Sequence, residues 1–217
     1  MKKFFLLTLS LILSAQFALA DSPLTSTPFS NAYKTNKYVM LANESGYFKK
    51  TEKALGSKKV SSLDKILMVN AIGWGTKSVG SFEAYLVSKR KGVSTKVFDY
   101  LKTVSDDVPA ENDETKLLSA DDLMCWAYFQ ALSDYNKPAL AIRAAFLAYK
   151  RDPANMSYGV VLGLVAAQKA FDRDWCDVYQ TANQMVVGTE YSNNQLNAEA
   201  VKIIMDYIGL YKQDCKE

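Results

Sequence analysis

The sequence predicts an all-α protein built from stacked antiparallel helix pairs and preceded by a cleaved signal peptide. Apolar residues recur at intervals of three and four along most of the chain, which is the periodicity of amphipathic helices. Only five prolines and ten glycines interrupt the 217 residues, so few helices are forced to end early. The first twenty residues have a different character, basic and then apolar, which is typical of an export signal.

The N-terminal segment carries the clearest signal. A basic start at Met1–Lys3 is followed by the apolar run "FFLLTLSLILSAQFA" and by "ALA" at 18–20, the small-x-small pattern of a cleavage site. The alternatives are a buried helix and a membrane anchor, but the run is short for a span of about 20 residues, and polar Asp21 follows at once. The residue directly after the cleavage point is Asp21 and not a cysteine that could carry a lipid. No later segment is apolar and long enough to span a membrane. We expect cleavage after Ala20 and a bacterial mature chain, 21–217, that is periplasmic or secreted.

Between residues 21 and 104 the helical pattern comes in short pieces, which we interpret as an N-terminal helical half. Thr27-Pro28 resembles a capping side chain followed by proline at the first helical position. Ser61 or Ser62 is placed to cap a later helix, and "GWG" at 73–75 is placed to end it. The expected helices are one from Pro28 to about Asn43, one ending at Gly56, and three with the faces Leu63-Ile66-Leu67-Asn70, Phe82-Tyr85-Leu86-Lys89 and Val97-Phe98-Leu101-Val104.

An acidic stretch at 105–120 separates this half from the rest of the chain. It crowds carboxylates around Pro109 and has little apolar content: Asp106, Asp107, Glu111, Asp113 and Glu114. Carboxylates are ligands of calcium, but the D-x-[DN]-x-[DN]-G spacing of a calcium loop is absent. Acid-rich turns commonly connect helices and cap the next one. We therefore interpret 105–120 as an acidic linker and expect no metal site.

From residue 121 to residue 217 the helical periodicity is stronger and more regular. The expected helices cover 121–135, 138–151, 156–169, 174–187 and about 194–211, the last with Val201, Ile204, Ile208 and Tyr211 on one face. Helix pairs of this length suggest a structural repeat with a period near 34 residues. A single pair buries too little apolar surface alone, so neighbouring pairs would complete the core, and the last helix would cap the stack.

Two partial repeats at 121–187 resemble the tetratricopeptide repeat (TPR) family. Ala141, Ala148, Asp152, Pro153 and Asn155 match the small positions of the second helix and the turn after it, and Leu162-Gly163 falls where the next repeat's Leu-Gly pair belongs. Tyr179 and Ala182 stand at the aromatic and small positions of the second repeat, 34 residues after Ala145 and Ala148. The chain departs from the pattern at Phe129, Ala145, Trp175 and Val187. The alternative is an irregular helical bundle whose alanine spacing is coincidental.

The resemblance implies a scaffold whose concave surface, lined by first-helix side chains, holds a peptide or a partner protein. The residues expected on that surface are Tyr128, Gln130 and Tyr158. Tyrosine suits recognition because it offers apolar area together with a hydroxyl. Core packing is the equally simple explanation for these three residues.

The three cysteines predict one disulfide and one free thiol in an oxidising compartment. In the antiparallel stack, Cys176 near the start of one second helix and Cys215 beyond the next helix fall on the same side, whereas Cys125 begins a first helix. We therefore expect a Cys176–Cys215 disulfide and a buried free Cys125. No CxxC is present, which argues against a thiol–disulfide exchange enzyme.

Composition limits the chemistry further. The chain has no histidine, which excludes Ser-His-Asp and Cys-His catalysis and most zinc sites. Residues 21–104 carry fourteen Lys or Arg against six Asp or Glu, a net charge of +8, whereas residues 105–217 carry ten against seventeen, a net charge of −7. This asymmetry can provide a face for an anionic partner, such as a glycan or an acidic protein. The alternative is that the two halves attract each other, or that each half is simply solvated. With so small a net charge on an exported chain we expect no nucleic-acid partner.

These observations favour an exported, non-enzymatic scaffold or adaptor that binds a protein or peptide and needs no cofactor. The first alternative is a periplasmic small-molecule or glycan binding protein that uses Trp74, Trp126 or Trp175 as a pocket wall, although tryptophans more often lie in the core. The second is a hydrolase with paired carboxylates. Only Glu83 and Glu199 lie inside apolar-rich helical segments, and both fit a solvated helix face.

Overall fold

The computed structural model describes residues 22–74, 78–103 and 111–216 of the chain. In these ranges every regular element is a helix, and the single β-type pairing is an isolated bridge between Asn155 and Asn193. The predicted all-α class is therefore confirmed. The expected signal peptide, the first part of the acidic linker and Val104 lie outside the described residues.

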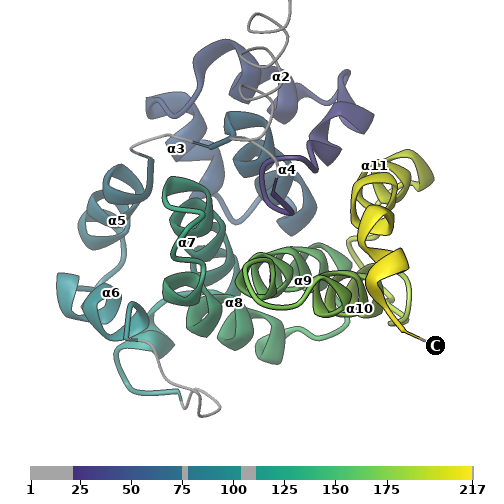
Figure 1. The fold of residues 1–217 in the computed structure, drawn as a ribbon. Coiled ribbons are helices and arrows are strands. Elements are labelled where there is room, and N and C mark those ends of the chain that lie inside the picture. Colours follow the sequence, from purple (N-terminus) through teal and green to yellow (C-terminus); the bar gives the residue numbers. More distant parts are fainter. Residues whose placement is uncertain (1–21, 75–77, 104–110, 217) are drawn as a thin grey trace, which may run out of the picture.

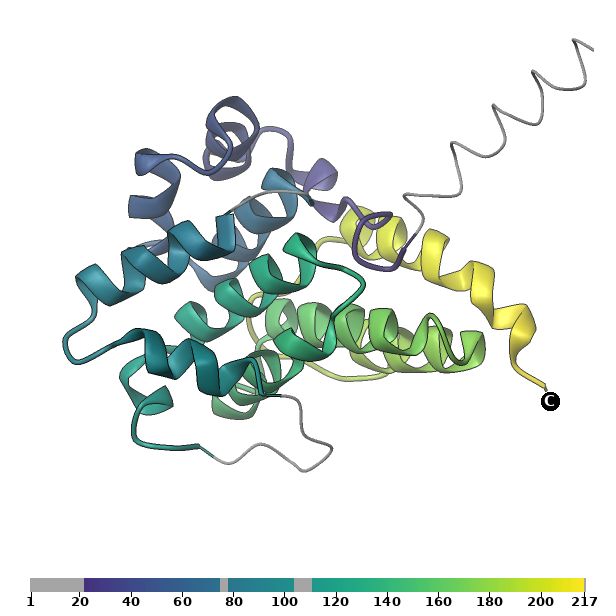
Figure 2. The same ribbon diagram turned by 60° about the vertical axis from the view of Figure 1, so that its left-hand side comes forward.

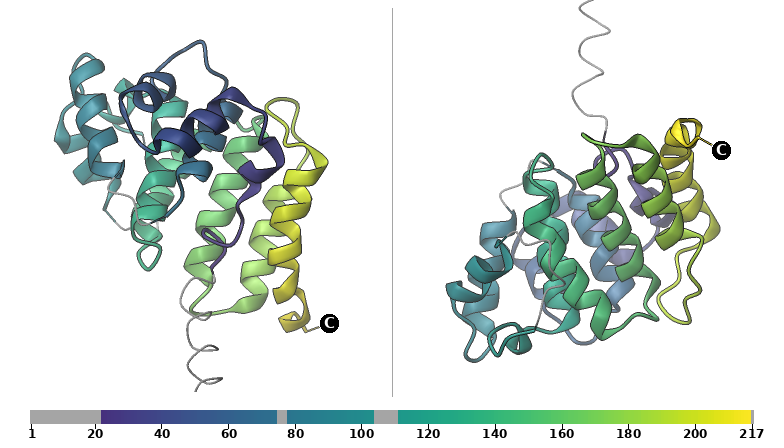
Figure 3. Two further views of the ribbon diagram at one scale, coloured as in Figure 1. Left: turned by 90° about the horizontal axis from the view of Figure 1, so that it is seen from above. Right: turned by 60° about the horizontal axis from the view of Figure 1, so that its bottom comes forward.

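The C-terminal half is a row of helices in which each packs against the next (Figure 1). Its members are α7 (Ala120–Ser133), α8 (Ala139–Arg151), α9 (Met156–Ala170), α10 (Trp175–Val186) and α11 (Ala198–Ile208), and the 3-10 helix η3 (Gly209–Asp214) continues α11. Figure 3 shows α9, α10 and α11 lying side by side along their lengths. The five helices expected after residue 121 are all present.

Side-chain caps fix where these helices begin. Ser119 caps α7 in a reciprocal box, in which its hydroxyl accepts from the Asp122 backbone N–H and the Asp122 carboxylate accepts from the Ser119 backbone N–H. Asp174 caps α10 by accepting from the backbone N–H groups of Cys176 and Asp177. Asn197 caps α11 by accepting from the Ala200 backbone N–H, so this helix begins later than the expected residue 194.

Small residues bring the helices of this row close together. Ala141 and Ala148, on one face of α8, are both completely buried. In α9, a Cβ added at Gly163 would lie only 2.7 Å from Cβ of Met185 in α10. The alanines and Gly163 therefore allow close packing of these helices, because larger side chains would separate the helix axes.

The N-terminal half consists of short helices that pack against this row (Figure 2). They are the 3-10 helix η1 (Phe29–Tyr33), α2 (Lys37–Ser45), α3 (Lys49–Leu55), α4 (Ser62–Ile72), α5 (Ser78–Lys89) and α6 (Thr95–Leu101). Helix α4 packs on α7 and α9, α5 packs on α7, and η1 packs on α11. One hydrophobic core runs through both halves.

The boundaries of α3 and α4 agree with the sequence prediction, but the first helix does not. Gly56 follows α3, Ser61 caps α4, and Gly73 ends it with a positive φ of 77° that favours glycine. The single helix expected from Thr27-Pro28 is wrong: η1 ends at Tyr33, and α2 starts anew after Asn36. The Thr27 hydroxyl donates to the Pro23 carbonyl instead of capping, and the Asn36 carboxamide caps α2.

The described part of the acidic linker is attached to the end of α8. It forms the short 3-10 helix η2 (Thr115–Leu117). The Arg151 guanidinium donates to the carbonyls of Thr115 and Leu118 and pairs with Glu111. One linker carboxylate, that of Glu111, and two backbone carbonyls therefore attach this segment to the end of α8. None of the helices in the described ranges has the length and apolar character needed to cross a membrane.

Candidate functional site

The inner face of the α7–α10 row, where the sequence places a partner-binding surface, is covered by α4 of the same chain. Tyr128, Gln130 and Tyr158 are 0%, 6% and 2% exposed. The Tyr128 hydroxyl accepts a hydrogen bond from Asn70 Nδ2 in α4 at 2.7 Å. The Tyr158 hydroxyl donates to Asp121 Oδ1 at 2.6 Å. In this structure the three residues therefore lie in the interior and not on an open surface. The Tyr128 hydroxyl, through Asn70, and the Tyr158 hydroxyl, through Ser62 Oγ at 3.2 Å, connect the two halves of the molecule.

The other residues singled out from the sequence are spread over the structure. Glu83 accepts a hydrogen bond from Trp126 Nε1 at 2.9 Å and pairs with Lys102 Nζ at 2.8 Å, so it is an interior partner rather than a purely solvated acid. Glu199 is exposed on α11, whereas Glu83 lies on α5. Trp126 is fully buried, whereas Trp74 and Trp175 are about half exposed.

A cavity of about 490 Å³ with many cationic side chains lies where four segments meet. We call it the basic pocket. The segments are the α3–α4 loop, α4, the end of α5 with the turn after it, and the stretch from η2 to the start of α7. Its lining residues are Gly56, Lys58, Lys65, Lys89, Arg90, Lys91, Leu117, Ser119, Asp121 and Asp122.

Two ion pairs form the inner wall of the basic pocket. Lys65, which is almost completely buried, pairs with Asp121. Arg90 donates to both carboxylate oxygens of Asp122, at 2.9 and 2.8 Å, and also to the Gly56 carbonyl. The buried Asp122 and the partly buried Asp121 are thus each matched by a cation, which is the condition for holding charge in a protein interior.

The pKa values of these groups follow from the contacts. Burial alone would raise the pKa of Asp121, but hydrogen bonds from Lys65, Ser62 and Tyr158 outweigh it and lower the pKa below its usual value. The hydrogen bonds to Asp122 raise the pKa of Arg90. The Asp121 carboxylate and the Arg90 guanidinium therefore stay charged at neutral pH.

The rim of the basic pocket carries positive charge that the chain does not neutralise. Lys58, Lys89 and Lys91 are exposed, and none of them has a carboxylate partner among the described residues. Five cations against two carboxylates line the cavity, an excess of three positive charges. Such a concentration of one sign attracts anions. In the sequence, the run "KRK" at 89–91 is the feature that could have indicated this pocket. The run alone does not define it, because the lining also includes residues from three other segments.

A second exposed feature lies at the other end of the row, around α10 and η3. We call it the aromatic end: Phe171, Trp175, Tyr207, Leu210 and Tyr211. Trp175 and Leu210 are 54% and 58% exposed. The Trp175 indole N–H donates to the Phe171 carbonyl at 3.1 Å, and the ring meets Tyr211 edge-on at 6.2 Å between centroids. The indole is therefore held in one orientation while much of its surface stays exposed.

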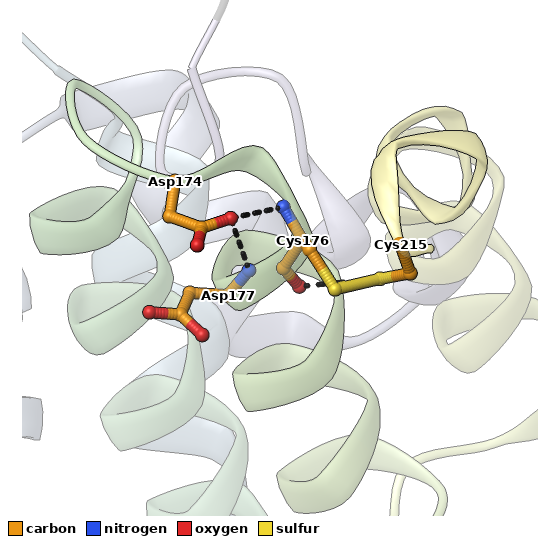
Figure 4. Close-up of a disulfide and its surroundings, with 4 residues drawn as sticks. All are labelled: Asp174, Cys176, Asp177 and Cys215. Atoms are coloured by element: carbon orange, nitrogen blue, oxygen red, sulfur yellow. Dashed lines mark hydrogen bonds between the residues drawn. A yellow bond between two sulfur atoms is a disulfide. The ribbon is translucent and has the colours of Figure 1, made fainter. Parts of the chain in front are cut away.

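The predicted disulfide fastens the aromatic end to the row of helices. Cys176, at the start of α10, is bonded to Cys215, just after η3, with a Cα–Cα distance of 4.7 Å (Figure 4). Cys125 in α7 is free and buried, as expected. Burial raises the pKa of the Cys125 thiol well above its usual value, so the thiol stays protonated and unreactive.

Within the ranges that the structure describes, no three Cys, Asp or Glu side chains are grouped closely enough to hold a metal ion. Comparison with protein-family models, with curated proteins and with solved structures finds no match for this chain.

Proposed function

We propose that the mature chain is an exported, non-enzymatic scaffold or adaptor that binds a protein or peptide partner at the aromatic end. One observation carries the proposal: Trp175 exposes a large apolar surface beside Tyr211, and Leu210, which precedes Tyr211 in η3, is also exposed, on a segment that a disulfide holds in place. Tryptophan and tyrosine dominate the binding energy of many protein interfaces. A surface fixed before binding loses little conformational entropy when the partner arrives.

The covered inner face supports an outer binding surface. Because α4 packs on α7 and α9, a partner cannot reach Tyr128 or Tyr158 while the chain is folded. In TPR-like scaffolds, which residues 121–187 resemble, the inner face is the usual contact. The proposal therefore keeps the scaffold role that the resemblance implies and moves the contact to the end of the row.

A pull-down with a matched pair of variants tests the proposal. The bait is the disulfide-intact chain 21–217, and the test variant is Trp175→Ala with Leu210→Ser. The control is Phe48→Ser, because Phe48 is 63% exposed but lies at the start of α3, outside the aromatic end. A partner captured from the native envelope is purified and titrated against all three proteins.

The expected result is unchanged binding by the control and binding about thirtyfold weaker by the test variant, since hot-spot residues contribute about 2 kcal/mol or more. Equal binding by all three proteins would contradict the proposal. Capture of an oligosaccharide in place of a protein would favour the alternative, a glycan binding protein, in which the fixed Trp175 indole stacks on a sugar ring.

A further inference from the structure

We propose that the basic pocket binds a small anion that carries several phosphate-type charges. This site is independent of the proposed function. In Figure 1, α3 and α5 lie at one side of the molecule and α10 and the C-terminus lie at the other, so the basic pocket and the aromatic end are well separated. A ligand in one does not touch the other.

Charge is the first argument. Lys65 and Arg90 are already neutralised by Asp121 and Asp122, so they contribute no net attraction. The attraction comes from Lys58 in the α3–α4 loop, Lys89 at the end of α5 and Lys91 in the turn after it, which lie around one cavity. An anion with a single charge would be held by one lysine in water, which is a weak interaction. An anion with several charges can contact the three ammonium groups together.

The type of cation is the second argument. A guanidinium recognises a planar carboxylate with two parallel hydrogen bonds, but the Arg90 guanidinium already makes such a pair with Asp122. Lysine ammonium groups act as compact point charges with three rotatable donors, and lysine is a common phosphate ligand in proteins. The free donors of the basic pocket therefore suit tetrahedral oxyanions better than carboxylates.

Size is the third argument. The cavity of about 490 Å³ lies within the range of sites for small molecules, roughly 300–1,000 Å³. The start of α7 adds little, because its Asp122 N–H and the Ser119 N–H are used within the capping box. Affinity should therefore depend on the rim lysines, which can be replaced without touching the core.

Isothermal titration calorimetry with sodium tripolyphosphate tests the inference on the disulfide-intact chain 21–217. The test variant is Lys58→Gln, Lys89→Gln and Lys91→Gln together. The control is Lys34→Gln, Lys49→Gln and Lys96→Gln, which removes the same charge from exposed lysines outside the pocket. Thermal unfolding of both variants verifies that they fold.

The wild type and the control should bind tripolyphosphate alike, and the test variant should bind it at least about tenfold more weakly. Affinity of the wild type should fall as salt is added. Trp175→Ala with Leu210→Ser should bind as the wild type does, which separates this inference from the proposed function.

Three results would overturn the inference. One is no binding by the wild type at low salt. Another is the same loss in both triple variants, which would show only a general effect of net charge. The third is equal or tighter binding of citrate or of a hexaglutamate peptide, which would assign the pocket to carboxylates or to an acidic protein segment.

Discussion

Asn70 in α4 offers the sharpest test of how the two halves are held together. Its Oδ1 accepts from the Ser30 backbone N–H at 2.8 Å, and its Nδ2 donates to the Thr27 carbonyl at 3.1 Å and to the Tyr128 hydroxyl at 2.7 Å. Asn70 is almost fully buried, and Thr27 and Tyr128 are completely so. One side chain therefore satisfies polar groups from the N-terminal segment and from α7.

Replacing Asn70 with alanine would leave these three groups without that partner. An unsatisfied buried polar group costs about 1–3 kcal/mol, and water entering the space left by the carboxamide offsets part of this. We expect Asn70→Ala to lower the free energy of unfolding by about 3 kcal/mol. Tyr128→Phe removes a single hydroxyl from the same network, and it should cost about 1 kcal/mol.

Urea unfolding of the disulfide-intact chain, followed by circular dichroism, measures both changes. With about 2–4 °C per kcal/mol for a domain of this size, Asn70→Ala should also lower the melting temperature by about 6–12 °C. In the double variant the two losses should not add, because the groups are in one network. A loss below about 1 kcal/mol for Asn70→Ala, or full additivity, would refute the proposed role of these hydrogen bonds.

Three further experiments address the helix row, the disulfide and the pH response. Gly163→Ala should destabilise the protein by about 1 kcal/mol, because overpacking against Met185 outweighs the better helix propensity of alanine. At Gly80 an added Cβ meets no atom within 4 Å, so Gly80→Ala should stabilise the protein by up to about 1 kcal/mol. Equal effects of these two changes in urea unfolding would contradict the close approach of α9 and α10. Cys176→Ser with Cys215→Ser opens a link between residues 39 apart and should cost about 4 kcal/mol in the same assay; an unchanged midpoint would show that the bond does not constrain the unfolded chain. Because the pKa of Asp121 is lower in the folded protein, the stability it contributes is complete above the unfolded value near 3.9 and is lost as the pH falls through the folded value. Asp121→Asn should therefore be less stable than the wild type at pH 7 and should lose less stability than the wild type between pH 5 and pH 3. The same loss in both proteins would exclude this carboxylate as a source of the acid sensitivity.

Local patterns predicted the helices well because their signals are contained within one segment. Helix α4 begins after Ser61 because of that residue's capping side chain and ends before Gly73 because of that residue's backbone conformation. Periodicity located the helices after residue 121. The first helix was predicted wrongly because Asn36, a better cap, restarts the chain after η1. Proline after threonine is compatible with a helix start but does not require one.

The candidate sites were harder to predict because they depend on how distant segments dock. Tyr128 and Tyr158 occupy the same helical positions whether the inner face is open or covered, so no local pattern showed that α4 would cover them. The basic pocket collects residues between 56 and 122 from four segments. The disulfide was predictable because the order of antiparallel helices already placed Cys176 and Cys215 at one end.

The buried position of Cys125 links the order of folding to the outcome of oxidation. In an unfolded chain any two of the three thiols can pair, and two of the three pairings involve Cys125. Once α7 is packed, its thiol is inaccessible and protonated, so an oxidant meets only Cys176 and Cys215. Correct oxidation thus reports that α7 has packed, and a chain that fails at this step is marked by mispaired or intermolecular disulfides on a non-reducing gel.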